Sequence, residues 1–435
     1  MLEKVKAALT HKDLRKRLLI VIALLVLTRV LAHVPIPGVD LEQIKSFFSQ
    51  NQVFGLVNLF SGGGLANFSI AMMGVGPYIT ASIIMQLLTM ATPKLEQLQK
   101  EGGEQGRRKI SQYTRLLTVP LAMLQAVGMI RLLQSQQVGG KPIIGQFALE
   151  QWLLTIIVLT AGTVLLMWLG ELITEKGIGN GISLIIFTGI VAGLPGALGQ
   201  SFQAALSGSQ VLTIGLVGVI ALAVTYAIVY ITEGQRNIPV TYARRSSGLR
   251  AGGSNTNIHL PLRVNQAGVI PIIFAVSVVL LPGILSEFFK QDKNQLVASV
   301  ARTVGDVFAT TKPWYWLTYF VLVLGFAYFY TSVTFNPKNV AENIQKQGGF
   351  IPGIRPGTET VGYLRYVLNR ITLVGGTFLG LVAVLPFLVQ FAVPDVRTLT
   401  IGGTSILIVI SVVLETLKQI NAQLLMRRYD YYGRS

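Results

Sequence analysis

The chain contains no cysteine among its 435 residues. Disulfide bonds and thiolate metal ligands are therefore excluded, whatever the compartment. Histidine is also scarce: the three copies, His11, His33 and His259, fall in three different predicted loops or tails. A lone histidine in a loop is usually a solvated surface residue, so we expect no metal site and no set of nucleophile, base and orienting group.

A phosphate-binding loop of the form Gly-x-x-x-x-Gly-Lys-Ser/Thr is missing as well, and so is any cluster of acidic residues that could hold a catalytic metal. We therefore expect a protein that is not an enzyme, that carries no cofactor and that has no ATPase activity of its own. Any energy that its work requires must come from a partner.

Charged residues are few, at 13%, against 51% hydrophobic residues. This balance indicates a polytopic, all-α membrane protein rather than a soluble domain. Apolar runs long enough to cross a bilayer predict about ten spans, near residues 18–34, 74–91, 116–133, 152–173, 182–200, 211–232, 267–286, 314–334, 371–391 and 402–424.

The positive charge, +17 in net terms, is unevenly distributed along these spans. If the N-terminus is cytoplasmic and the spans alternate, 27 of the 36 Lys and Arg residues lie on the cytoplasmic side and eight on the other. The positive-inside rule then places both termini in the cytoplasm. Within the spans acidic residues are nearly absent: Glu171, Glu233, Glu287 and Glu415 lie near predicted span ends.

An uncharged linker at 196–210 separates five spans from five, which divides the chain into halves at 1–200 and 201–435. Two halves that each have an odd number of spans can share one fold only if the second half is inverted. The functional site then lies at the interface between the halves. Both transporters and channels are built in this way. A proton- or ion-coupled transporter needs ionisable groups near the midplane, and their scarcity favours a channel.

Two loops on the cytoplasmic side, 234–266 and 335–370, are longer than the other connections, are interrupted by Gly and Pro, and carry several Arg residues. IPVTYARR predicts a short strand, and IPGIRPG predicts a turn that holds Arg355 at a fixed point. Long basic loops of this kind are suited to docking on RNA phosphates or on acidic protein surfaces.

Between the first two long spans lies a third unusual stretch, Phe60–Thr80. It is apolar but too short to cross a bilayer, and it is interrupted by Gly62–Gly64 and by Gly74, Gly76 and Pro77. We expect a half-helix of about three turns over LANFSIAMM, bounded by these breaks. Backbone that does not span is tolerated in a membrane only where protein or a cavity surrounds it.

Five motifs identify the family. NLFSGG followed by MGVGPYITASIIMQLL (58–88), EKGIGNGISLIIFTGIVAGLP (175–195) and GGFIPGIRPGTET (348–360) occur in order, with HLPLRVNQAGVIP (259–271) and GGTSILIV (402–409) in support. Together they resemble the SecY family, whose members are the large subunits of bacterial protein-conducting channels. The resemblance covers nearly the whole chain and implies two inverted halves of five helices around an hourglass pore in the bacterial cytoplasmic membrane.

Four sets of residues receive roles from this resemblance. The aliphatic constriction of the pore would consist of Ile79, Ile83, Ile186, Ile190, Ile273 and Ile408. A mobile plug that seals the outer funnel would comprise Phe60, Ser61, Gly62, Gly63, Gly64, Leu65, Ala66, Asn67, Phe68, Ser69, Ile70, Ala71, Met72 and Met73. Polar residues at a lateral gate toward the lipid would be Thr80, Gln86 and Asn265. The cytoplasmic docking residues would be Arg244, Arg245, Arg250 and Arg355.

The family also implies partners: the small subunits SecE and SecG, the motor ATPase SecA, the ribosome, signal sequences and nascent polypeptides, and the membrane lipids. The resemblance thus implies a translocase subunit that passes unfolded polypeptides across the membrane and membrane segments sideways into it. Two alternatives stay open at this stage, a secondary transporter of a small solute built from inverted repeats and a passive scaffold for membrane assembly.

Overall fold

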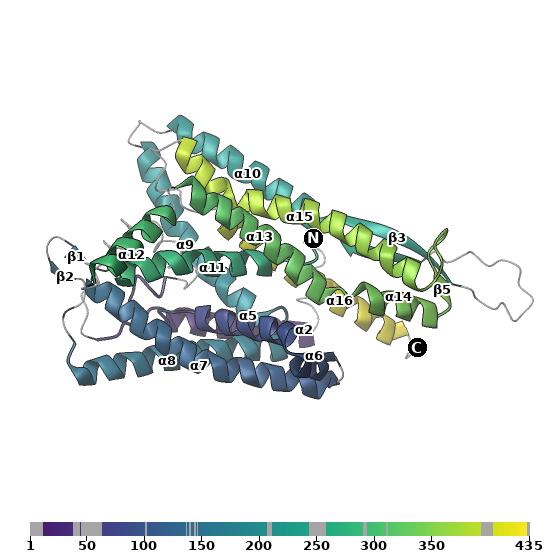
Figure 1. Cartoon of the computed structure of the whole chain (residues 1–435), viewed down its shortest axis with the longest axis horizontal. Helices are drawn as coiled ribbons and strands as arrows, with labels where there is room; N and C mark the ends of the chain where they lie inside the picture. Colours follow the sequence, from purple (N-terminus) through teal and green to yellow (C-terminus); the bar gives the residue numbers. More distant parts are fainter. Residues whose placement is uncertain are drawn as a thin grey trace, which may run out of the picture.

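A computed structural model of the chain is a long, mostly helical molecule (Figure 1). It describes residues 12–37, 44, 63–100, 102–135, 137–138, 141–142, 145, 147–206, 211–242, 258–289, 294–309, 312–392 and 403–432. The predicted docking residues Arg244, Arg245 and Arg250, and the first three residues of the predicted plug, Phe60 to Gly62, lie outside these ranges.

Each of the ten predicted spans overlaps a helix. These helices are α2 (Lys12–Leu31), α5 (Gly76–Ala91), α7 (Gly103–Ser135), α8 (Leu149–Lys176), α9 (Gly181–Leu206), α10 (Val211–Glu233), α11 (Ile270–Phe289), α13 (Pro313–Thr334), α15 (Thr358–Ala392) and α16 (Gly403–Tyr432). Among the described residues, five helical segments are long and apolar enough to cross a membrane: Gly103–Gln134, Leu149–Lys176, Pro313–Lys346, Thr358–Val389 and Ser405–Leu424. The mostly helical membrane fold agrees with the sequence, and the number ten stays a prediction.

Three shorter helices join the long ones: α6 (Pro93–Lys100), α12 (Gln295–Val307) and α14 (Pro337–Lys346). Their beginnings follow from local sequence. Asn294 accepts a hydrogen bond from the backbone N–H of Leu296, and Asn336 accepts from the N–H groups of Lys338 and Asn339. These side chains therefore satisfy donors at the first turn that the helix itself leaves free.

The predicted linker at 196–210 is corrected by the structure. Helix α9 continues without interruption from Gly181 to Leu206 and includes Pro195. A proline in a membrane helix is tolerated because neighbouring groups can satisfy the backbone that it frees. Helix α9 therefore extends into the stretch that we expected to be a linker, and helix α10 begins at Val211.

The predicted half-helix over LANFSIAMM is also wrong. Residues 63–75 form a chain of turns with one isolated β-bridge, between Ser69 and Pro35. Gly63, Phe68 and Gly74 have positive φ angles of 82°, 40° and 56°, which a right-handed helix cannot include. The backbone of this segment is satisfied by turn hydrogen bonds, such as Phe68 N–H to Leu65 O and Met72 N–H to Ser69 O, and by two bonds to the segment after α2: Ile36 N–H donates to Phe68 O at 2.9 Å, and Ile70 N–H donates to Val34 O at 3.1 Å.

Both long basic loops meet in one small sheet. Strand β3 (Gln235–Tyr242) pairs antiparallel with β4 (Ile258–Arg263) and, at its far end, with β5 (Gly349–Phe350), so the strand order is β4-β3-β5. A separate apolar cluster joins this sheet to α14 and to the start of α15, with Ile238, Leu262, Ile344 and Leu364 buried in it. The expected strand in IPVTYARR is confirmed as far as Tyr242.

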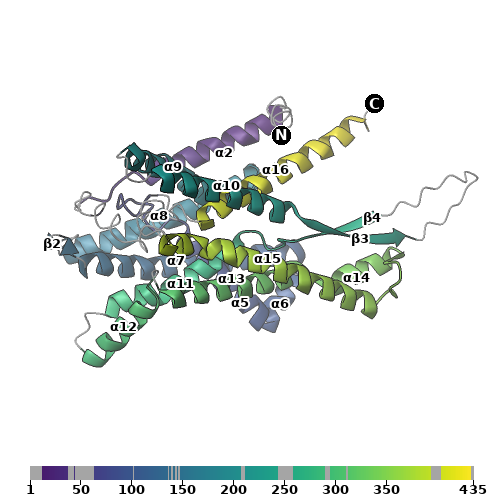
Figure 2. The ribbon, with the colours of Figure 1, turned by 90° about the horizontal axis from the view of Figure 1, so that it is seen from above.

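The two ends of the molecule differ in what they carry. Helices α6 and α14, the β3–β4 hairpin and the C-terminus lie at one end, and α12 with the short strands β1 (Gln137–Val138) and β2 (Lys141–Pro142) lies at the other (Figures 1 and 2). The segments to which the charge distribution assigned the cytoplasm are thus gathered at a single end.

Candidate functional site

The largest apolar cluster of the molecule joins residues from both halves of the chain. Ile186 and Ile190 of α9, Ile273 of α11 and Ile408 of α16 belong to it, and Ile79 of α5 packs against it. These are five of the six isoleucines predicted to form a ring. The sixth, Ile83, is buried as well, at 6% exposure, but lies outside the cluster.

The segment 63–75 connects this cluster with a second one. Ala71 and Val75 belong to the cluster that contains the isoleucines. Leu65, Phe68 and Met72 belong to the second cluster, together with residues of α7 and α8 such as Ile130 and Leu159. The segment 63–75 thus contributes residues both to the cluster that contains the isoleucines and to the cluster that it shares with α7 and α8.

Its internal structure depends on small groups. The N–H and the hydroxyl of Ser69 both donate to the carbonyl oxygen of Gly64, at 3.0 and 3.1 Å, and Ser69 is fully buried. On α8, a Cβ atom on Gly162 would collide with the carbonyl oxygen of Ile70. Close contact between the segment and α8 therefore requires glycine at position 162.

The polar residues predicted for a lateral gate lie on or near α5 and α11, and α11 contacts both α5 and α7. Thr80 donates to the carbonyl oxygen of Gly76, and Gln86 donates to Ser82, both within α5. Asn265 accepts from the N–H of Gly268 at 2.9 Å. Gln86 Oε1 and Asn265 Nδ2 are buried without a partner, the one an acceptor and the other a donor.

Arg355, the docking residue that the structure describes, is exposed in a turn between Gly353 and Gly357, whose φ angles are 81° and 109°. The Thr360 hydroxyl donates to the carbonyl oxygen of Arg355 at 2.9 Å. The turn is therefore held between β5, which pairs with β3, and the start of α15.

Two of the acidic residues at the predicted span ends are paired. Glu171 of α8 forms a 2.7 Å ion pair with Arg115 of α7, and Glu233 of α10 forms one of 2.9 Å with Lys418 of α16. No group of three or more His, Asp or Glu residues in the described part of the chain could hold a metal ion. These carboxylates therefore connect helices rather than mark an ion pathway.

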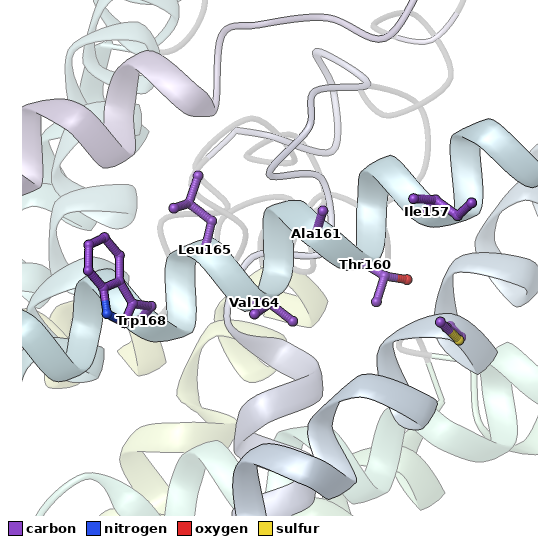
Figure 3. Close-up of a pocket in the computed structure, with 7 residues that line it drawn as sticks. Ile157, Thr160, Ala161, Val164, Leu165 and Trp168 are labelled. Carbon is purple, nitrogen blue, oxygen red and sulfur yellow. The ribbon is translucent and has the colours of Figure 1, made fainter.

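An apolar groove of about 480 Å³ lies on the outer side of the α7–α8 pair. Ile157 and Trp168 stand at its two ends, and Thr160, Ala161 and Val164 lie between them (Figure 3). Small residues between two bulky ones on a membrane helix allow a neighbouring helix to approach closely. The geometry suits a transmembrane helix lying alongside α8.

The comparisons with known proteins agree with the motifs. The SecY family model matches residues 69–417. The chain belongs to the SecY family. It is 45% identical over 445 residues to the protein translocase subunit SecY of Streptomyces galbus, with 100% of both chains covered. The counterpart from Pseudomonas aeruginosa is 44% identical over 422 residues, which cover 96% of this chain and 92% of the relative.

Solved structures share the fold at low identity. A structure described as that of a protein conducting channel matches with a TM-score of 0.63 and 18% identity over 93% of this chain and 91% of the other. A SecY structure determined to study its plug domain matches at 0.62, with 18% identity over 92% and 90% of the two chains. The channel of a canine ribosome-channel complex from the endoplasmic reticulum matches at 0.61, with 17% identity over 93% and 91%.

Reasoning from the sequence missed the short helices α6, α12 and α14, the strands β1, β2 and β4, and the pairing of β5 with β3. Asparagine followed by apolar residues at helical spacing marks the start of α12 and of α14 and was the available signal there. The β3–β5 pairing joins residues more than 100 positions apart, through two residue pairs, and no local pattern could have indicated it.

Proposed function

We propose that the chain forms a protein-conducting channel for unfolded polypeptides, with the isoleucines at its constriction and the segment Phe60–Met73 as its plug. The observation that carries the proposal is the position of residues 63–75, which pack between the isoleucine cluster and the α7–α8 pair. Membership of the SecY family favours this function over a small-solute transporter.

The chemistry of the constriction fits its task. Aliphatic side chains form no hydrogen bonds with a passing backbone, adapt to side chains of different size, and exclude water when the gap is narrow. The plug is held by packing and by a few hydrogen bonds to the segment after α2, such as Ile36 N–H to Phe68 O. It is therefore an element that an entering polypeptide can displace without unfolding a helix.

The lateral gate, in this proposal, is the seam between α5 and α7 on one side and α11 and α13 on the other. Gln86 of α5 and Asn265, which precedes α11, carry the buried unpaired atoms Oε1 and Nδ2. A polar contact inside a membrane contributes about 1–2 kcal/mol, so a seam without one opens more readily. An apolar signal sequence or membrane segment would pass between these helices into the lipid.

The ends and sides of the molecule offer binding positions for the partners that the family implies. The basic loops, including Arg355 and the predicted docking residues Arg244, Arg245 and Arg250, would dock the ribosome or the motor ATPase SecA. The groove on α8 would accept a transmembrane helix of a small subunit such as SecE or SecG. Both termini would lie in the cytoplasm of a bacterial cell, at the basic end of the molecule.

Reconstitution provides the test. The chain is incorporated into lipid vesicles with its two small subunits, and SecA, ATP and a radiolabelled secretory precursor are added. We expect ATP-dependent protection of the precursor from added protease, and cross-linking of a stalled precursor to single cysteines at the six isoleucine positions. The native absence of cysteine makes each cross-link assignable to one position.

A matched control is a cysteine at Leu222 of α10, an exposed position that faces away from the cluster. It should not cross-link to the precursor. Flux of a small solute in the absence of precursor, together with unprotected precursor, would instead support the inverted-repeat transporter. If Ile190→Asp changed neither translocation nor ion leak, the chain would act as a scaffold and the channel proposal would be wrong.

A further inference from the structure

Helix α12 presents three different faces along its length. Ala298 and Ala301 are buried, and α12 packs against α11. Leu296, Val300 and Val307, spaced so that they lie on one face of a helix, are exposed by 76%, 63% and 41%. Small residues thus contact the protein, while the large apolar residues of the same helix point away from it.

The third face is polar and carries Arg302, Asp306 and Ser299, all exposed. The Ser299 hydroxyl on this face donates to the carbonyl oxygen of Leu296, and the Thr303 hydroxyl, which lies between Val300 and Val307 on the apolar face, donates to that of Ser299, so the helix itself satisfies both groups. One opposite-charge pair, Arg302 and Asp306, stands one turn apart. A helix with protein, apolar and polar faces side by side is built for a boundary between lipid and water.

The exposed apolar face continues the membrane-facing surface on both sides of α12. Leu285 and Phe289 at the end of α11 are exposed by about half. After α12, helix α13 begins with exposed Trp314, followed one turn later by exposed Leu317. Tryptophan is enriched where membrane spans enter the headgroup region. These neighbouring residues therefore indicate that the membrane–water interface lies at the level of α12.

The end of the molecule that carries α12 is opposite to the basic end with β3, β4 and α14 (Figure 2). We propose that α12 is an interfacial helix that lies in the headgroup region of the bilayer leaflet at this end, with Leu296, Val300 and Val307 inserted among the lipid acyl chains. Its partner is the lipid surface, and it anchors the end of α11 to that surface.

Site-directed spin labelling tests this proposal. The full chain is reconstituted in vesicles of phosphatidylcholine and phosphatidylglycerol, with a single cysteine in place of Val300 or of Arg302 on the polar face. Power saturation then compares collisions of the label with oxygen, which concentrates in the acyl chains, and with a water-soluble nickel chelate. Leu317→Cys on α13 serves as the reference for a position that faces lipid.

An apolar face inserted about 5–10 Å into the boundary region predicts a ratio of oxygen to nickel accessibility several-fold higher at position 300 than at position 302, and close to that at 317. Leu296→Cys repeats the measurement at an independent position of the same face. Equal accessibility to nickel at 300 and 302 would overturn the proposal. Protection of position 300 from both reagents would overturn it too, because a protein partner rather than lipid would then cover the face.

Discussion

Gly162 is a residue at which the packing of the proposed plug leaves no room for a single added atom. It lies in the middle of α8, and a Cβ atom there would meet the carbonyl oxygen and the side chain of Ile70. Helix propensity alone would favour alanine over glycine at this position by about 1 kcal/mol. The close approach of the plug explains why a poor helix former occupies the interior of a membrane span.

The substitution Gly162→Ala should therefore destabilise the chain, by about 1–3 kcal/mol as for other overpacked sites. The same change at Gly218 of α10, where nothing lies within 4 Å of the added atom, should leave stability unchanged or raise it slightly. Thermal unfolding of the purified variants in detergent shows whether the two substitutions change stability in opposite directions. Ion leak through vesicles should also rise for Gly162→Ala, since the displaced plug no longer seats against the isoleucines.

If both alanine variants unfold at the same temperature as the parent chain, the contact between Ile70 and α8 does not exist in the membrane. If unfolding changes but the leak does not, the contact exists and the segment does not act as a seal. The two measurements thus separate the packing of residues 63–75 from the function proposed for them.

At the scale of elements, the turn between α8 and α9 is joined to α16. The side-chain oxygen of Gln419 accepts a hydrogen bond from the N–H of Gly179 at 2.8 Å. Gly179 has a φ of 96°, which favours glycine, and a Cβ atom there would approach Thr416. Beside this bond, Leu14 and Ile178 form a small buried cluster with Ile420 and Leu424 packed against it. Elements of both halves therefore meet here.

Replacing Gln419 by leucine removes the acceptor and leaves the Gly179 N–H without its partner, at a cost of about 1–3 kcal/mol. We expect faster hydrogen exchange in peptides that cover residues 175–182 in the full chain. Gln419→Glu keeps an acceptor oxygen and should preserve the protection. Unchanged exchange in Gln419→Leu would show that the turn is held by the apolar cluster alone.

The elements also show how far the sequence determines the fold. Apolar runs identified every long helix, because a membrane leaves the backbone no alternative to internal hydrogen bonds. The same rule predicts a helix at LANFSIAMM, where turn hydrogen bonds and two bonds to Val34 and Ile36 satisfy the backbone instead. The uncharged stretch 196–210 indicated a linker, but α9 continues to Leu206. Motifs marked the isoleucines of the ring, whereas only the structure brings Ile186, Ile273 and Ile408 into one cluster.

The two halves of the molecule meet along two sides, and different contacts hold each side. On one side α9 contacts both α10 and α16, and the Gln419 hydrogen bond with its apolar cluster secures the basic end. On the other side α11 contacts α5 and α7, and Gln86 Oε1 on α5 is buried without a partner. Because a hydrogen bond and a buried apolar cluster hold the first side, we expect the second side to be the weaker one.

This difference predicts the direction in which the molecule opens. The side at α9 and α16 should act as the pivot, and the side at α5 and α11 should separate. A cysteine pair at Ile178 and Ile420, joined by a short bifunctional thiol reagent, should leave translocation close to that of the untreated variant. A pair at Gln86 and Asn265, joined by the same reagent, should block translocation until a cleavable reagent is reduced.

Each pair serves as the control for the other, since both carry two cysteines and one bridge between the halves. Translocation is measured as protease protection of a precursor in vesicles, at matched cross-linking yields. Inhibition by the bridge between 178 and 420 would show that the halves move at the α9–α16 side, and the proposed pivot would be wrong. The bridge between 86 and 265 keeps these positions together even when the weak contacts along the seam are lost. Full activity with this bridge would therefore mean that polypeptides pass without separation of α5 from α11.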